Sequence, residues 1–141
     1  MVDSLPSVEF VRSQGTGRPG ATPGSIDYRL ARRRLLRQFR AGEVFASDIC
    51  DAQRELLRVA GNASVPARQP CPVCGERQLR IVRFVFGPRL PSGGRAVTSA
   101  AELRRLAGRQ GDHRCYEVEV CLDCRWNHLQ STYLLAEELS A

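Results

Sequence analysis

Two short segments with the same cysteine spacing, CPVCG at residues 71–75 and CLDCR at residues 121–125, decide the fold of this chain. Each segment places two thiols three positions apart, a spacing at which one tight turn presents both sulfur atoms to a metal ion. In the first segment, the glycine permits the positive φ that lets backbone amides approach the sulfurs. Four cysteine thiolates in a tetrahedron are a common structural zinc site. The sequence therefore predicts one structural zinc ion with four ligands, namely Cys71, Cys74, Cys121 and Cys124.

The residues next to the two cysteine pairs alternate between apolar and polar side chains, which is typical of strands. One such run, QLRIVRFVF at residues 78–86, follows the first pair, and another, RCYEVEV at residues 114–120, precedes the second. A third strand is expected from His128 to about Leu135. We therefore predict an α+β protein whose residues 71–136 form a zinc ribbon of about three antiparallel strands.

A segment between the first two predicted strands carries turn and helix signals. Ser99 and Glu102 are spaced as a capping box, which predicts a short helix over AAELRRLA at residues 100–107. The gap from Cys74 to Cys121 holds 46 residues, whereas compact sites of this kind have about 15 to 20. We interpret the excess as a helix inserted between two ribbon strands.

The region before the cysteines has the pattern of amphipathic helices. Asp27 is expected to cap a helix over residues 28–41, in which Tyr28, Leu35 and Phe39 form one narrow apolar stripe.

A second helix is expected to start at Ser47 or Asp48 and to end at Gly61. Because the two helices are joined by about six residues, the sequence predicts a helical hairpin over residues 26–61, packed on the ribbon. Residues 62–70 are interpreted as a linker.

The first predicted helix is unusually basic. It carries six arginines and no acidic residue, and arginine makes planar, bidentate contacts with phosphate. A solvated face in an arginine-biased chain is the alternative interpretation. Four of the arginines cluster on a face away from the apolar stripe, and we consider these the candidate contact for nucleic acid or a partner: Arg29, Arg33, Arg37 and Arg40.

The overall composition limits the class of protein. The chain has 141 residues with 21 arginines, no lysine and 15 acidic residues, which gives a formal net charge of +6. No apolar run approaches the roughly 18 residues of a membrane span, and no apolar run near the start indicates a secretory signal, so a cytoplasmic protein is expected. Residues 1–25 are rich in Gly, Pro, Ser and Thr and are predicted to be a disordered leader. Residues 137–141 form a short acidic tail.

The remaining cysteines and the histidines leave alternatives open. Cys50 lies near a helix N-terminus, where a thiol pKa can fall, but a catalytic cysteine needs a base, and His113 and His128 are the only histidines. We expect Cys50 and Cys115 to be buried thiols. His128, four positions after the last cysteine, is an alternative zinc ligand, although packing beside Trp126 is the interpretation that we favour.

The order of these segments resembles that of a known family. An arginine-rich helix, then ICDAQRELLRVA at residues 49–60, CPVCG, an SGGRA turn and EVCLDCRWNHL at residues 119–129 are similar to a small actinobacterial family known only as a domain of unknown function. The similarity covers residues 25 to 136, and EVCxxCxWNH is its most specific motif. The resemblance implies a zinc-ribbon fold and an actinobacterial cytosol, and it implies no particular activity.

The sequence favours a binding protein over an enzyme. It contains no phosphate loop, GxSxG or HExxH motif. Zinc ribbons with basic helices often serve the transcription or translation machinery. We therefore expect a non-enzymatic module that associates with RNA polymerase, a ribosome or nucleic acid through its arginine-rich helix. A rubredoxin-like electron carrier, which uses the same sulfur tetrahedron for iron, and an adaptor for one protein partner are the alternatives.

Overall fold

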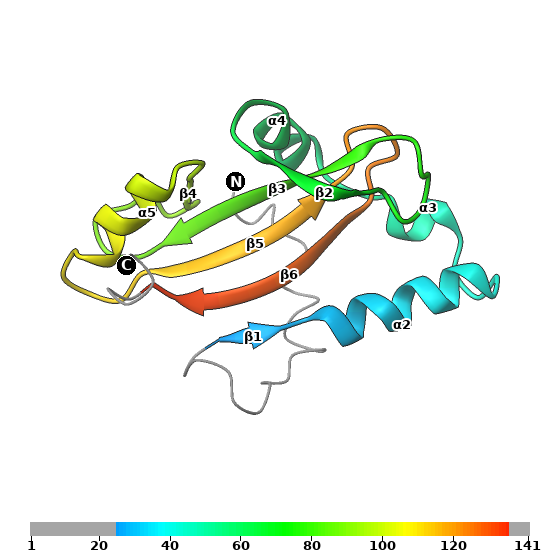
Figure 1. The fold of residues 1–141 in the computed structure, drawn as a ribbon, viewed down its shortest axis with the longest axis horizontal. Helices are drawn as coiled ribbons and strands as arrows, with labels where there is room; N and C mark the ends of the chain where they lie inside the picture. Colours follow the sequence, from blue (N-terminus) through cyan, green and yellow to red (C-terminus); the bar gives the residue numbers. More distant parts are fainter. Residues whose placement is uncertain (1–24, 136–141) are drawn as a thin grey trace.

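The computed structural model describes residues 25–135, so the predicted leader and the acidic tail lie outside the described part of the chain, apart from Ser25. The described elements form a curved antiparallel sheet with helices packed around it (Figure 1). In chain order, these elements are β1 (Ile26–Asp27), α2 (Arg29–Arg40), α3 (Ala46–Ile49), α4 (Arg54–Asn62), β2 (Val65–Pro70), β3 (Gln78–Phe86), β4 (Arg95–Ala96), α5 (Ala100–Ala107), β5 (Arg114–Val120) and β6 (Asn127–Leu134).

The three predicted ribbon strands form the centre of this sheet. The six-stranded sheet has the order β1-β6-β5-β3-β2, with β4 paired to β3, and each pairing is antiparallel. The register between β3 and β5 is regular and places Val82 opposite Val118. Alternation of apolar and polar residues therefore identified the central strands, and the structure adds three outer strands to them.

The segment predicted as a linker contains one of these outer strands. Pro66 of β2 is paired with Arg80 of β3, and Pro70 is paired with Gln78. Proline has no backbone N–H, so it is tolerated only where a strand edge needs no further donor. The prediction of a linker was wrong because a polar, proline-containing segment is also what an exposed edge strand requires.

The helices α2 and α4 do not form the predicted hairpin. Leu56 of α4 packs against Val82 in one apolar cluster, whereas Leu36 of α2 packs against Leu79 in another. Because Val82 and Leu79 lie three positions apart on a regular strand, their side chains point to opposite faces of the sheet. Each helix therefore buries its apolar side on a different face of the sheet instead of against the other helix.

The second predicted helix is divided into two pieces. The short helix α3 ends at Ile49, and α4 begins at Arg54. In the connecting segment, the backbone N–H of Ala52 donates to the carbonyl oxygen of Arg125 at 3.0 Å. This bond ties the segment to the second cysteine turn, and a continuous helix could not make it because its N–H groups bond within the helix. The predicted cap is displaced by one residue: Tyr28 occupies the N-cap position of α2, but the carboxylate of Asp27 still accepts from the backbone N–H of Arg29, the first residue of the helix, at 2.8 Å.

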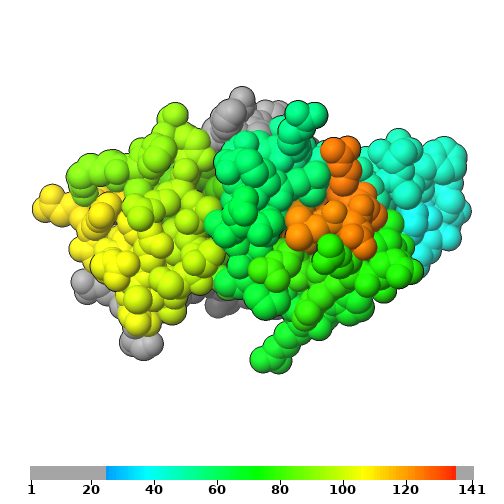
Figure 2. Space-filling view, turned by 90° about the horizontal axis from the view of Figure 1, so that it is seen from above, coloured from blue at the N-terminus to red at the C-terminus, as the bar shows by residue number. Residues whose placement is uncertain are grey.

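The inserted helix lies at the end of the sheet away from α3 (Figure 1). As predicted, α5 spans residues 100–107, and the Ser99 hydroxyl accepts from the backbone N–H of Glu102 at 3.0 Å. Leu106 packs with Val85 and Cys115 in a third apolar cluster. On the face that Figure 2 shows, α4 lies between α5 at one end and the second cysteine turn at the other.

Candidate metal centre

The two cysteine pairs meet at the end of the sheet that α3 covers. The four Sγ atoms of Cys71, Cys74, Cys121 and Cys124 all lie within 4.8 Å of one another. Two of the separations are 3.6 Å, between Cys71 and Cys124, and 3.7 Å, between Cys74 and Cys121. A zinc ion with sulfur ligands at about 2.3 Å in a tetrahedron requires sulfur separations of about 3.8 Å. The predicted ligand set is therefore brought together, and it fits a metal ion such as zinc.

The two pairs are held by equivalent turns. The N–H of Gly75 donates to the carbonyl oxygen of Cys71 at 2.9 Å, and the N–H of Arg125 donates to that of Cys121 at 3.1 Å. Both turns end in a left-handed residue, with φ of 69° at Gly75 and 76° at Arg125. Glycine adopts this conformation freely, whereas arginine loses about 1 kcal/mol there. The carbonyl that Arg125 presents is the one that binds Ala52, so this turn also anchors the segment between α3 and α4.

Backbone amides point at the sulfur atoms. Cys71 Sγ accepts from the N–H of Val73 at 3.4 Å, and Cys74 Sγ accepts from that of Glu76 at 3.5 Å. Burial raises the pKa of Cys71 and of Cys124 to about 12. Burial also acts to raise the pKa of Cys74. The hydrogen bonds that Cys74 makes with the amide of Glu76 and with the side chains of Cys121 and Cys71 outweigh burial and lower this pKa. A metal ion must therefore displace protons from Cys71 and Cys124 when it binds at neutral pH.

A buried polar network lies behind the second cysteine turn. The Trp126 Nε1–H donates to Glu119 Oε2 at 2.7 Å, and Arg32 of α2 pairs with the same oxygen at 2.7 Å. Gln130 also donates to this carboxylate, whose side chain is 1% exposed. Glu119 therefore joins α2 to the segment that carries two of the cysteines. Its alternation with Val118 and Val120 placed it in a strand, but no signal in the sequence indicated that it is buried or paired.

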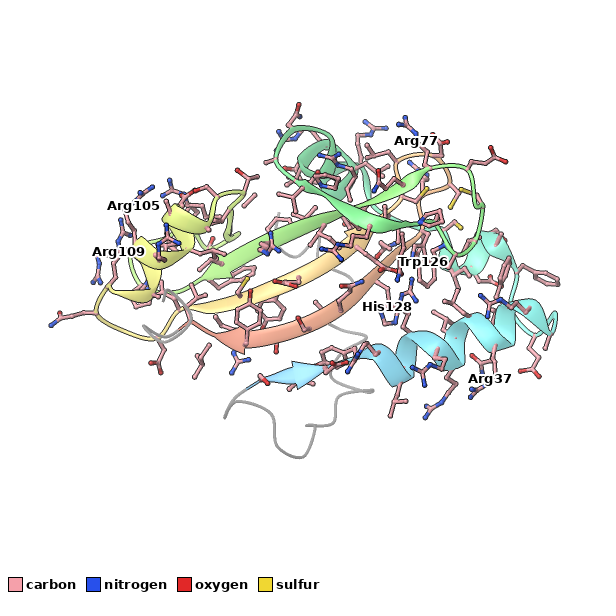
Figure 3. The ribbon with its side chains drawn as sticks, viewed as in Figure 1. Arg37, Arg77, Arg105, Arg109, Trp126 and His128 are labelled. Carbon is pink, nitrogen blue, oxygen red and sulfur yellow. The ribbon has the colours of Figure 1, made fainter. Side chains whose placement is uncertain are left out.

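His128 lies outside the ligand group. Its ring stacks on Trp126 with centroids 5.8 Å apart and 15° between the planes, and the two side chains lie side by side in Figure 3. Nδ1–H donates to the carbonyl oxygen of Leu129 at 2.7 Å. Burial lowers the pKa of His128, so the ring is neutral at pH 7. Among residues 25–135, the converging ligand atoms are those of the four cysteines, which favours the packing role expected for His128.

The two remaining cysteines have different environments. Cys115 is fully buried in the cluster beneath α5, and burial raises its pKa to about 11, which confirms a buried thiol. Cys50 is only half-buried, and it lies between α3 and α4 with its Sγ 3.6 Å from Sγ of Cys124. The expectation of a simple buried thiol was wrong for Cys50, because the break in the second predicted helix directs this side chain to the metal centre.

The candidate contact arginines are exposed on α2. Arg29, Arg33, Arg37 and Arg40 all have exposed side chains, and Arg37 points away from the sheet in Figure 3. Arg29 pairs with Asp27 at 3.0 Å. The other three make no ion pair with a residue of the described range 25–135. No acidic side chain of the described range neutralises these three charges.

A groove runs between α2 and β2. It has a volume of about 400 Å³ and is lined by Arg29 and Arg32 from the helix and by Arg68 from the strand. Its floor is made by Leu79 and Ile81 together with the polar ends of two further side chains, Glu119 and Gln130. Of the lining arginines, Arg29 pairs with Asp27 and Arg32 with Glu119, whereas Arg68 makes no ion pair with another described residue. Within the described residues, no helix has the length and apolar character needed to cross a membrane.

Comparison with known proteins places the chain in a family. The family described as "Family of unknown function (DUF5318)" matches residues 22–141, and the chain belongs to it. This confirms the resemblance inferred from the sequence motifs. The uncharacterized proteins Rv0049 of Mycobacterium tuberculosis (strain H37Rv) and Mb0050 of Mycobacterium bovis are each 41% identical to the chain over 110 residues, which cover 78% of this chain and 80% of the relative. No solved structure gives a significant match.

Proposed function

We propose that this protein is a non-enzymatic zinc-binding module that contacts nucleic acid, within nucleoprotein machinery such as RNA polymerase or the ribosome, through the arginine face of α2. The observation that carries the proposal is the exposure of Arg33, Arg37 and Arg40, which lack ion pairs with other described residues. Unpaired arginines on one helix face attract phosphates and gain affinity by releasing counterions.

The length and surroundings of α2 suit a phosphate backbone. From Arg29 to Arg40 the helix extends by about 16 Å, at 1.5 Å per residue, which covers several phosphates of one strand at about 3.4 Å of helix axis each. Arg68 stands across the groove from Arg29 and Arg32. A backbone that followed α2 would therefore meet Arg68 on the far side of this groove, opposite Arg29 and Arg32, whose charges are offset by Asp27 and Glu119.

The composition of the metal centre supports a structural role for zinc. Four cysteine thiolates fill a tetrahedron, whereas catalytic zinc sites keep one position for water or substrate. Here the ion would join two turns that are distant in the sequence, and α2 is fixed to the second of them through Arg32, Glu119 and Trp126. Zinc binding would thereby hold the arginine face in position.

The test is a binding measurement with a matched control. Arg33→Glu combined with Arg37→Glu reverses two charges on α2, and Arg105→Glu combined with Arg109→Glu makes the same change at the opposite end of the molecule (Figure 3). Both variants should fold, because exposed substitutions usually change stability by under about 0.5 kcal/mol. Binding to a fluorescent single-stranded RNA and to a DNA duplex is followed by anisotropy across a salt series.

The α2 variant should lose affinity at low salt, and its salt slope should fall by between about one and two units, since each phosphate contributes about 0.7 to 0.9. The variant with substitutions at Arg105 and Arg109 should keep the slope of the wild type. Equal loss in both variants would show that only net charge matters and would contradict the assignment to α2. In native extracts, a complex that survives nuclease treatment, and whose salt dependence does not follow the number of phosphates contacted, would instead support a protein partner.

A further inference from the structure

We propose that Cys50 and Cys124 form an oxidation site, at which peroxide joins the two sulfurs in a disulfide and withdraws Cys124 from the metal centre. The inference goes beyond the proposed binding function and concerns a cysteine outside the ligand set. It starts from the 3.6 Å separation between the two Sγ atoms, across which the Cys50 thiol donates to Cys124. Both side chains are half-buried, so a small oxidant reaches them from solvent.

Cys50 is placed as a neighbour of the centre and not as one of its ligands. Its Sγ contacts that of Cys124, whereas the group of four that converge within 4.8 Å leaves Cys50 out. Zinc with four thiolates has no position for a fifth sulfur. Cys50 therefore stays a thiol beside a metal-bound thiolate, which is the arrangement of a reactive sulfur with a resolving partner.

The local backbone permits the two sulfurs to meet. A disulfide needs a sulfur separation of about 2.05 Å, so the side chains must approach by about 1.5 Å. Cys50 is the C-cap residue of α3, and its backbone, at φ −101° and ψ 67°, has left the helical conformation, so its side chain is not directed by a further helical turn. The bond from Ala52 to the carbonyl of Arg125 keeps this segment against the turn that carries Cys124.

Geometry also favours this pair over two ligand cysteines. Cys71 lies at the same 3.6 Å from Cys124, but in the zinc-bound protein both of these sulfurs are ligands. A disulfide between them breaks two metal–sulfur bonds, whereas a disulfide between Cys50 and Cys124 breaks one. Since Cys50 is outside the ligand group, its disulfide with Cys124 forms with the loss of fewer metal–sulfur bonds.

The reaction balances with hydrogen peroxide as the oxidant. The Cys124 thiolate attacks one peroxide oxygen, the O–O bond breaks, hydroxide leaves and a sulfenic acid forms. The Cys50 sulfur then displaces the sulfenic oxygen, which leaves as water with the thiol proton, and the S–S bond forms. The sulfur pair loses two electrons, and peroxide is reduced to one water and one hydroxide. Three thiolates remain for the metal, so its affinity falls.

The experiment follows metal release from the zinc-loaded full chain. Hydrogen peroxide is added with a zinc-responsive chelating dye, and the products are mapped by peptide mass spectrometry. The wild type should release its zinc together with formation of the Cys50–Cys124 disulfide, and a dithiol reductant with added zinc should restore the starting state. Cys50→Ser should release zinc at least tenfold more slowly, whereas Cys115→Ser, which changes a distant buried thiol, should behave as the wild type.

Each alternative outcome has a defined meaning. Equal release rates in the wild type and Cys50→Ser, or a disulfide that joins two of the four ligands, would overturn the proposal. Zinc content and circular dichroism of the reduced variants are measured first. If Cys50→Ser and Cys50→Ala both fail to bind zinc, Cys50 is part of the ligand set, and the proposal is wrong.

Discussion

Replacing Glu119 with alanine removes the carboxylate that joins α2 to the end of the sheet where the four cysteines cluster. This side chain is 1% exposed and accepts from Arg32 and Trp126, each at 2.7 Å. Loss of one partner of a buried ion pair costs about 3–5 kcal/mol. Because the Arg32 side chain keeps 22% exposure to water, we expect a smaller cost of about 2–3 kcal/mol. The melting temperature should then fall by about 10 °C.

Glu117→Ala is the matched control in the same strand. Glu117 pairs with Arg83 at 2.9 Å and accepts from the Tyr133 hydroxyl at 2.8 Å, but its side chain is 21% exposed and that of Arg83 is 27% exposed. Its removal should cost about 1–2 kcal/mol, less than the removal of the buried Glu119. Thermal and denaturant unfolding measure both variants, and the emission of the single tryptophan, Trp126, reports loss of the indole hydrogen bond in Glu119→Ala alone. Equal destabilisation by the two variants would refute the argument that the Glu119 network holds α2 in place.

Three further predictions concern the metal centre. Cys74→Ser should lose the metal and unfold, because structural zinc contributes roughly 10 kcal/mol to small domains; a folded variant by circular dichroism would contradict this. Zinc affinity should rise with pH by about two log units or more per pH unit near neutrality, since Cys71 and Cys124, with pKa values raised to about 12, must each release a proton; chelator competition at several pH values measures the slope, and a pH-independent affinity would oppose it. Arg125→Gly should keep the fold and the metal because glycine adopts the φ of 76° freely, whereas Gly75→Val, at a φ of 69°, should lower the melting temperature by an amount equivalent to about 1–2 kcal/mol; equal melting temperatures for the two variants would show that the turns tolerate any residue.

Local patterns were sufficient to predict the central strands of the sheet and the clustering of the four cysteines. The spacing of Cys71 to Cys74 and of Cys121 to Cys124 determines two turns, and the alternation in β3 and β5 aligns them at one end of the sheet. The helix α5 was predicted at its observed bounds because Ser99 caps it locally. These features depend on neighbours within a few residues, which a sequence displays directly.

Features set by contacts distant in the sequence were not predictable. Periodicity correctly grouped Leu35 and Phe39 of α2, which pack with the buried Leu36, but it wrongly added Tyr28, which lies in the other cluster. It also could not show that the sheet offers α2 and α4 separate faces. The break that directs Cys50 to Cys124 depends on the bond between Ala52 and Arg125, which are far apart in the chain. The role of Glu119 depends on Arg32 in the same way. A polar residue in an alternating strand is ordinarily exposed, whereas Glu119 is buried and bonded to Arg32 of α2, Trp126 and Gln130.

The most direct test of the account is metal analysis of the protein purified without added metal, followed by X-ray absorption at the edge of the metal found. The account predicts one zinc per chain with four sulfur neighbours at about 2.3 Å. A folded protein that contains no metal would contradict it. A nitrogen neighbour of the metal would also contradict the account, because it would make His128 a ligand. Iron with a visible charge-transfer band would contradict it as well and would favour a role in electron transfer.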